Sequence, residues 1–137
     1  MMTTVVMNPT TGRRVLVVDD IVVNRKLATA FFGRMGWHCA DVEGGTAALT
    51  WLANNPAVDL LLLDISMPDL CGEDVCLQLR ANPAYARLPI VAYTAHAMQT
   101  DIDRFMANGF NAALIKPISM QTLKNVVARF FPDGKTE

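Results

Sequence analysis

Residues Val58-Asp59-Leu60-Leu61-Leu62-Leu63-Asp64 form an apolar run that ends in a carboxylate and leads directly into Ile65-Ser66-Met67-Pro68. A continuous apolar run of this length is typical of a strand that is buried on both faces of a parallel sheet. A charge at the end of such a strand needs a partner or a function. Three other apolar runs also end in polar residues: 15–18 before Asp19 and Asp20, 90–93 before Thr94, and 112–115 before Lys116.

Strand-like and helix-like segments alternate along the whole chain. The predicted strands cover residues 14–19, 37–42, 58–64, 88–94 and 112–116, and the predicted helices cover residues 21–35, 46–54, 73–81, 98–108 and 120–131. In the first helix, Leu27, Ala30, Phe31 and Arg34 recur at helical spacing, and Gly36 is its expected end. Five strand–helix units predict an α/β fold with a parallel sheet covered by helices on both faces, because parallel strands need crossover connections.

The length and composition fit one domain with one core, since the chain has 137 residues of which 52% are hydrophobic. We expect residues 1–13 to be a flexible lead-in, residues 14–131 to be the folded domain and residues 132–137 to be a short tail. We therefore expect no attached DNA-binding domain.

The charge pattern excludes several functional classes. The net charge is -1 and no Lys/Arg block occurs, so electrostatics alone predicts neither nucleic-acid nor membrane binding. No apolar run approaches the ~18 residues of a membrane span, and the N-terminus lacks a signal peptide, which favours a cytoplasmic protein. The three cysteines, an odd number without CxxC spacing, indicate buried or partly buried, unreactive thiols rather than a disulfide or zinc site.

The polar strand ends predict one site, because ligands of open parallel sheets bind outside the carboxyl ends of the strands. Three carboxylates at that edge, Asp19, Asp20 and Asp64, would either raise one another's pKa or hold a cation. A set of oxygen ligands alone favours Mg²⁺. Together with Lys116 and Thr94, such a site suits phosphoryl transfer onto an aspartate. The chain contains neither GxxxxGK[ST] nor GxGxxG, so a nucleotide-binding loop is not supported.

Each residue of this set also has a simpler explanation when it is taken alone. Asp20 could cap the first helix, and Asp64 could belong to an ordinary turn. Thr94 alone carries no signal, and Lys116, which precedes Pro117, could be a solvated loop residue. Their joint occurrence, each after a predicted strand, favours the common site.

At these residues the chain resembles the receiver domains of response regulators, the phospho-acceptors of two-component signalling. The resemblance spans about residues 14–131. Its motifs are Val17-Val18-Asp19-Asp20, Leu62-Leu63-Asp64-Ile65-Ser66-Met67-Pro68 with Gly72, Tyr93-Thr94-Ala95, and Lys116-Pro117. Asn24-Arg25 and Ala95-His96-Ala97-Met98 look most like receivers of hybrid histidine kinases. The resemblance implies a flavodoxin-like (βα)5 three-layer sandwich with strand order 2-1-3-4-5.

The resemblance also implies a role for each motif residue. Asp64 would accept a phosphoryl group from a phosphohistidine on a histidine kinase or histidine phosphotransfer protein. Asp20, Asp64 and the Ser66 carbonyl would bind Mg²⁺, with Asp19 acting largely through a metal-bound water. Lys116 would pair with the acceptor and then with the phosphoryl group, and its bond to Pro117 is expected to be cis.

The same resemblance implies a switch and an output surface. Thr94 and the backbone amide of Ala95 would close onto the phosphate and shift the population of a surface formed by the fourth helix, fifth strand and fifth helix. A downstream protein would bind there. The family commonly has an aromatic residue three positions before the lysine, whereas this chain has Ala113, and Ser66 and His96 would tune the lifetime of the phosphoryl group.

Three functions follow as hypotheses. The first is a signalling phospho-acceptor, not an enzyme, with slow self-dephosphorylation. The second is a degenerate receiver that binds proteins without phosphorylation, which would be marked by loss of Asp20, Asp64 or Lys116. The third is a small Mg²⁺-dependent aspartyl phosphatase, for which Asp69 is the only nearby second carboxylate.

Overall fold

A computed structural model describes residues 12–55, 57–95 and 98–132 of the chain. The folded domain expected for residues 14–131 falls within this range, except for residues 56, 96 and 97. Most of the predicted lead-in and nearly all of the predicted tail lie outside the described residues.

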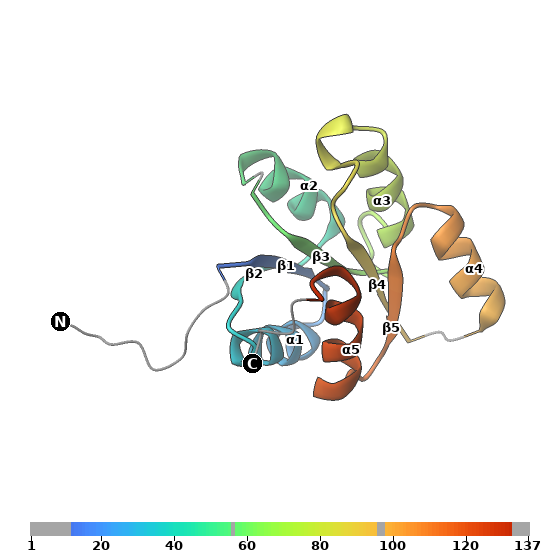
Figure 1. The fold of residues 1–137 in the computed structure, drawn as a ribbon. Helices are drawn as coiled ribbons and strands as arrows, with labels where there is room; N and C mark the ends of the chain where they lie inside the picture. Colours follow the sequence, from blue (N-terminus) through green and yellow to red (C-terminus); the bar gives the residue numbers. More distant parts are fainter. Residues whose placement is uncertain (1–11, 56, 96–97, 133–137) are drawn as a thin grey trace.

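Five parallel strands form one sheet in the order β2-β1-β3-β4-β5, which confirms the flavodoxin-like fold (Figure 1). The strands are β1 (Arg14–Val18), β2 (His38–Val42), β3 (Leu60–Asp64), β4 (Ile90–Thr94) and β5 (Ala112–Ile115). The helices are α1 (Val22–Arg34), α2 (Gly45–Asn54), α3 (Gly72–Arg80), α4 (Gln99–Ala107) and α5 (Met120–Phe130), with a 3₁₀ helix at Pro83–Tyr85. Every predicted strand and helix is present.

The observed boundaries differ from the predicted ones by at most two residues. The largest differences are at the starts of two strands, since β3 begins at Leu60 and β4 at Ile90, two residues later than predicted. Leu88 instead closes the turn that follows the 3₁₀ helix, because its amide donates to the carbonyl of Tyr85. The sequence pattern did not predict that helix, which Asn82 caps by accepting from the amide of Ala84.

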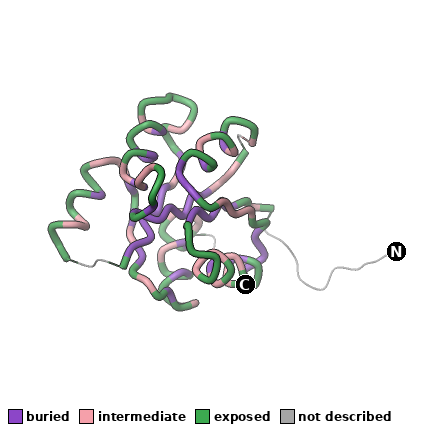
Figure 2. Tube along the Cα trace, turned by 180° about the vertical axis from the view of Figure 1, so that it is seen from behind, coloured by how far each residue is buried: buried purple, intermediate pink, exposed green. Residues whose placement is uncertain are grey.

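The core consists of two apolar layers, one on each face of the sheet. Figure 2 shows that the buried residues concentrate in the central part of the fold. One layer packs α2, α3 and α4 against the sheet, and the other packs α1 and α5 against the opposite face. All five residues of β3 are buried, as are all five of β4. The central strands therefore have no solvent-facing side, which explains why they read as continuous apolar runs.

The buried face of α1 differs from the prediction. Ala28 and Phe32 are fully buried, whereas Ala30 and Arg34 of the predicted stripe are exposed. The predicted pair Leu27 and Phe31 lies at the margin of the core. The stripe is rotated by about one residue, because several apolar residues of α1 compete for the inward face and its amphipathic pattern is weak.

Trp37 and Phe32 are buried in the core, and Phe131 packs against it. The Trp37 ring packs edge-on against Phe32 and Phe131, with 5.3 Å between ring centroids in each pair. Gly36 ends α1 in a left-handed conformation with φ of 85°, which a residue with a side chain adopts at a cost. The Lys116–Pro117 peptide bond is cis, as the resemblance implied.

The cysteines follow the prediction except at one position. Cys76 is buried and Cys71 is partly buried, but Cys39 on the edge strand β2 is exposed, so the prediction of burial is wrong there. Desolvation of its sulfur and the Asp41 charge nevertheless raise the pKa of Cys39 to about 11, which disfavours the reactive thiolate. In the described residues, no helix is both long enough and apolar enough to cross a lipid bilayer.

Candidate functional site

The ends of four strands bring the predicted polar residues to one edge of the sheet. Asp64 is the last residue of β3 and Thr94 the last of β4, while Asp19 follows β1 and Lys116 follows β5 directly. The strands are in register there, since Val18 pairs with Leu63 and Thr94 pairs with Ile115. The parallel ladder therefore places these side chains together, although more than 50 residues separate Asp64 from Lys116.

Three carboxylates form the centre of this edge. One ligand atom from each of Asp19, Asp20 and Asp64 lies within 4.8 Å of the others. Asp19 and Asp64 are buried, whereas Asp20 is exposed and leaves an approach from solvent. Within the described part of the chain, Asp19 Oδ2 is a buried oxygen with no hydrogen bond of good geometry. A hard divalent cation fits this set, because all the donor atoms are oxygens and their combined negative charge is only partly balanced.

Lys116 supplies the balancing positive charge. Its Nζ lies 2.9 Å from Asp19 Oδ2 and donates to Asp64 Oδ1 at 3.0 Å. The ammonium also lies 4.6 Å from the centroid of the Tyr93 ring, within the range of a cation–π contact. The backbone helps to hold the lysine in place, because the Lys116 amide donates to the Thr94 carbonyl at 2.7 Å.

The electrostatics of the site follow from burial and from these contacts. Burial raises the pKa of Asp64 to about 6, and the Asp19 charge adds to this, although Lys116 and the Ser66 amide act against it. Burial acts to lower the pKa of Lys116, but its contacts with the carboxylates of Asp19 and Asp64 outweigh burial and raise that pKa. Burial and the two carboxylates raise the pKa of Tyr93 to about 12. The lysine therefore stays cationic at neutral pH.

Asp19 is held in place by its own backbone neighbours. Its Oδ1 accepts from the amide of Ile21 at 2.8 Å, just before α1 begins. The N-cap of α1 is Ile21, which makes no side-chain cap hydrogen bond. The alternative that Asp20 caps this helix is therefore wrong, and the Asp20 side chain faces the approach to the carboxylate cluster.

Arg25 fixes the backbone between β1 and α1, a role that sequence reasoning missed. Its Nη1 donates to the Asp19 carbonyl and its Nε to Asp41 Oδ2 on β2, each at 2.9 Å. Because the guanidinium is planar and forked, it can hold both groups at once. A basic residue one turn into the helix that follows an acidic pair was the only signal in the sequence.

The segment from Asp64 to Gly72 forms a compact loop beside the cluster. The Ser66 amide donates to Asp64 Oδ1 at 3.3 Å, and the Gly72 amide donates to the Ile65 carbonyl at 2.9 Å. A Cβ atom on Gly72 would collide with the Asp64 carbonyl oxygen, so only glycine allows this closure. Asp64 therefore does take part in a turn, since its carboxylate accepts from the Ser66 amide. The same carboxylate also belongs to the shared site.

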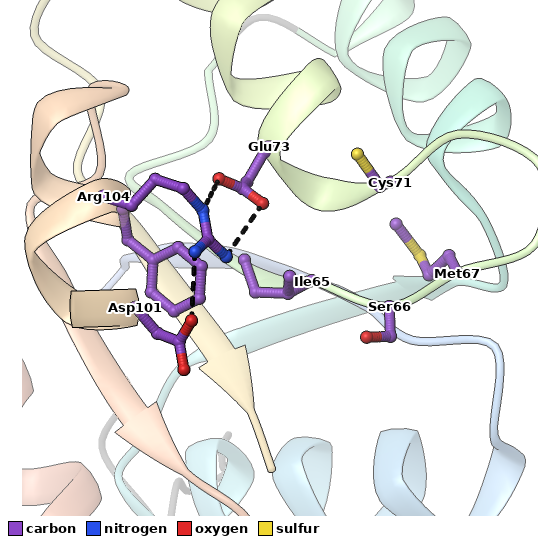
Figure 3. Close-up of a pocket in the computed structure, with 8 residues that line it drawn as sticks. Ile65, Ser66, Met67, Cys71, Glu73, Asp101 and Arg104 are labelled. Atoms are coloured by element: carbon purple, nitrogen blue, oxygen red, sulfur yellow. Dashed lines mark hydrogen bonds and ion pairs between the residues drawn. The ribbon is translucent and has the colours of Figure 1, made fainter. Parts of the chain in front are cut away.

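A hollow of about 460 Å³ lies between this loop and α4 (Figure 3). Ser66, Met67 and Cys71 line one side of it, and Arg104 lies opposite between Glu73 and Asp101. Arg104 donates to Glu73 Oε2 at 2.8 Å and to Asp101 Oδ1 at 3.0 Å. Asn108 Nδ2 also donates to Glu73, at 2.9 Å. These bonds tie α4 to the start of α3 next to the carboxylate site.

Of the other residues predicted for the site, some lie at its edge and others lie away from it. Thr94 is buried at the end of β4 and Ala95 is exposed directly after it, so both lie at the site edge. His96 lies outside the described residues. Ala113 is in the middle of β5, where it packs against the apolar layer that contains Phe105. It is therefore not part of the carboxylate cluster.

Residues 15–128 match the family model described as response regulator receiver domain. Among curated proteins, the chain is 38% identical over 120 residues to the sensor protein GacS of Pseudomonas syringae. It is 34% identical over 118 residues to the histidine-protein kinase BarA of Escherichia coli, and 33% identical over 114 residues to the sensor histidine kinase RcsC of Salmonella typhimurium. These alignments cover 85%, 86% and 83% of this chain, but only 13%, 13% and 12% of the respective relatives.

Solved structures share the fold. The receiver domain of the sensor histidine kinase PA1611 from Pseudomonas aeruginosa has a TM-score of 0.80 and 28% identity, with 90% of this chain and 100% of that chain covered. It was crystallised with a magnesium ion coordinated in its active-site cleft. A response regulator from Chloroflexus aurantiacus has a TM-score of 0.83 at 24% identity, covering 89% of this chain and 99% of that chain, which supports the fold alone.

Proposed function

The chain belongs to the response regulator receiver domain family of two-component phosphorelays, and from this premise we propose that Asp64 accepts a phosphoryl group from a phosphohistidine. The observation that carries the proposal is the contact of Lys116 Nζ with Asp64 Oδ1 inside a cluster of three carboxylates. The donor would be a histidine kinase or a histidine phosphotransfer protein.

Asp20, Asp64 and the carbonyl of Ser66 would hold Mg²⁺, and Asp19 would act largely through a bound water. When bound, the ion supplies positive charge that offsets the charge of the phosphoryl oxygens. The oxygen-only ligand set and the burial of Asp19 and Asp64 support this assignment. The magnesium ion in the PA1611 receiver domain supports it further.

In the transfer step, a carboxylate oxygen of Asp64 attacks the phosphorus atom of the donor. The new P–O bond forms as the P–N bond to the donor imidazole breaks, and that nitrogen keeps the electron pair and takes a proton from water. Lys116 would hold the carboxylate before the transfer and a phosphoryl oxygen after it. Its raised pKa supports this role, because the lysine keeps its charge throughout.

The phosphoryl group would then recruit Thr94 and the amide of Ala95. Thr94 closes the polar edge from β4, and Ala95 begins the connection to α4, so a small inward movement would change the position of that helix. The new contacts shift a population between two arrangements rather than create a new fold. Ser66 and His96 would tune how slowly the phosphoryl group is lost to water.

The downstream partner would bind the surface formed by α4, β5 and α5. Large apolar side chains are exposed there, namely Met98, Met106 and Ile115. A groove of about 330 Å³ lies between β5 and α5, and Ala113 is one of its lining residues.

The phosphoryl donor would bind beside the start of α1. Ile21, Val22 and Val23 follow Asp20 directly, and their side chains are 51%, 51% and 70% exposed. Three consecutive exposed aliphatic residues next to a polar site favour a protein contact, because an isolated domain gains nothing from leaving them in water. A partner on this surface could bring its phosphohistidine close to Asp64.

The two other candidate functions have less support. A degenerate receiver would have lost part of the cluster, yet Asp20, Asp64 and Lys116 are all present. A phosphatase would need a free second acid, but the carboxylate of Asp69 accepts from the backbone amides of Gly45 and Thr46. Both findings favour the phospho-acceptor.

The proposal is tested by binding of beryllium fluoride, a phosphoryl mimic, in the presence of Mg²⁺. Amide resonances of residues 94–95 and of α4 and β5 should shift in the wild type and stay unchanged in Asp64→Asn. A wild-type protein that gives no shift would contradict the proposal. Equal shifts in the two proteins would show binding elsewhere and would also contradict it.

A further inference from the structure

We propose that Asp69 is a positioning residue, whose carboxylate ties the metal-binding loop after β3 to the first turn of α2. This inference rests on the proposed function, because the loop contains Ser66, whose carbonyl would be a magnesium ligand. Asp69 itself would not contact the ion or the phosphoryl group.

The tie consists of two backbone hydrogen bonds. Asp69 Oδ1 accepts from the Gly45 amide at 3.2 Å, and Oδ2 accepts from the Thr46 amide at 3.1 Å. The N-cap residue of α2 is Gly44, which has no side chain to satisfy these amides. A residue more than 20 positions later in the chain therefore caps the helix, and both oxygens of its carboxylate are used.

Close packing reinforces the two hydrogen bonds. A Cβ atom on Gly45 would lie 2.6 Å from the Leu70 carbonyl oxygen and 2.8 Å from a methyl group of Val75. The start of α2 can approach the loop this closely because residue 45 is glycine. The loop is thus held at Ile65 by its hydrogen bond with Gly72 and at Asp69 by its hydrogen bonds with α2. Ser66 lies between Ile65 and Asp69 in the sequence.

The charge of Asp69 strengthens the contact. The amide of Thr46 contributes most to lowering the pKa of Asp69 to about 2, so the carboxylate is ionised at neutral pH. A negative charge is favourable at the positive end of a helix dipole. The loop is therefore anchored by charge-assisted hydrogen bonds, although the Asp69 side chain is exposed.

The consequence concerns metal affinity. A carbonyl ligand binds well only when its backbone is already in the right position, so loosening the loop raises the entropy cost of binding. Residues that orient ligands typically change metal affinity about 10- to 100-fold. Because two residues, Met67 and Pro68, lie between Asp69 and Ser66, we expect the lower end of that range.

Three variants separate anchoring from charge. Asp69→Ala removes both hydrogen bonds, and Asp69→Asn removes the charge but keeps one acceptor oxygen for the helix amides. Asp74→Ala is the matched control, because Asp74 is an exposed carboxylate in the first turn of α3. Mg²⁺ titration calorimetry gives the affinity, and amide hydrogen exchange at Gly45 and Thr46 reports the tie without the ion.

We expect Asp69→Ala to weaken Mg²⁺ binding about tenfold and to speed exchange at both amides. Asp69→Asn should recover most of the affinity, because Asn is about as good as Asp as a helix cap, and Asp74→Ala should change it less than about twofold. Equal losses in Asp69→Asn and Asp69→Ala would show a pure charge effect and overturn the inference. Unchanged Mg²⁺ affinity in Asp69→Ala would overturn this inference but not the proposed function. A wild type that binds no Mg²⁺ would overturn both.

Discussion

Lys116 Nζ lies 3.0 Å from Asp64 Oδ1, which joins the ends of two strands that are not neighbours in the sheet. The same ammonium is 2.9 Å from Asp19 Oδ2, so one lysine neutralises carboxylates from two different strands. All three side chains are buried or nearly so, with 17% of the Lys116 side chain exposed. Without the lysine, the two buried carboxylates would lose the ammonium that contacts both of them.

Replacing Lys116 with methionine should therefore destabilise the fold in the absence of Mg²⁺. Removing one partner of a buried ion pair typically costs about 3 kcal/mol or more, because the remaining charge is left without compensation. Urea denaturation at pH 7 gives the free energy of unfolding. Lys124→Met on the exposed surface of α5 is the control and should change it by less than about 0.5 kcal/mol. Equal effects of the two variants would contradict the described ion pairs.

Replacing Arg25 with lysine should cost about 1 to 2 kcal/mol of unfolding free energy, even though the charge is kept. A single ammonium cannot reproduce the fork that holds the Asp19 carbonyl and the Asp41 carboxylate together. Arg34→Lys at the exposed end of the same helix is the control, and it should be nearly neutral. A neutral Arg25→Lys would mean that the fork contributes little to the junction of β1 and α1.

The contribution of Asp69 should depend on pH in a defined direction. Its pKa is about 2 in the folded protein, below the ordinary value of 3.8, so the folded state binds a proton less readily than the unfolded state. Its stabilising effect is then complete above pH 3.8 and disappears as the pH falls towards 2. The difference in thermal midpoint between wild type and Asp69→Asn should shrink over this window. A difference that stays constant or grows would contradict the assigned pKa.

Removing the guanidinium in Arg104→Ala should have little effect on the thermal midpoint, since surface ion pairs contribute little. It should, however, speed hydrogen exchange in α4, because Arg104 joins this helix to Glu73 at the start of α3. Arg129→Ala on α5 is the control for loss of an exposed arginine and should leave α4 exchange unchanged. Unaltered exchange in Arg104→Ala would show that α4 is held by its apolar contacts alone.

The fold and the central site could be predicted because each depends on local sequence. The run that ends at Asp64 is apolar at every position since β3 is buried on both faces, and the strand ends place their polar residues at one edge. The strand order itself is not a local signal and was implied by the family resemblance. The register of α1 was harder, because its many apolar residues do not define one inward stripe, and the buried residues are Ala28 and Phe32.

The supporting contacts could not be predicted, because each joins segments whose distance in space depends on loop conformation. Asp69 lies in the loop after β3 but caps α2, which precedes β3 in the sequence. The residues around Asp69 give no sign of that contact. The Glu73–Arg104 pair likewise spans 31 positions. Arg25 follows Asp19 by six positions, yet its bond to Asp41 depends on the pairing of β1 with β2.

The most direct test of the central claim is phosphorylation of Asp64 itself. The wild type and Asp64→Asn are incubated with Mg²⁺ and acetyl phosphate, and each intact mass is measured with and without a chelator of the metal. The account predicts a gain of one phosphoryl group in the wild type, which depends on Mg²⁺ and is absent from Asp64→Asn. An unmodified wild type, or a variant that gains the same mass, would contradict it.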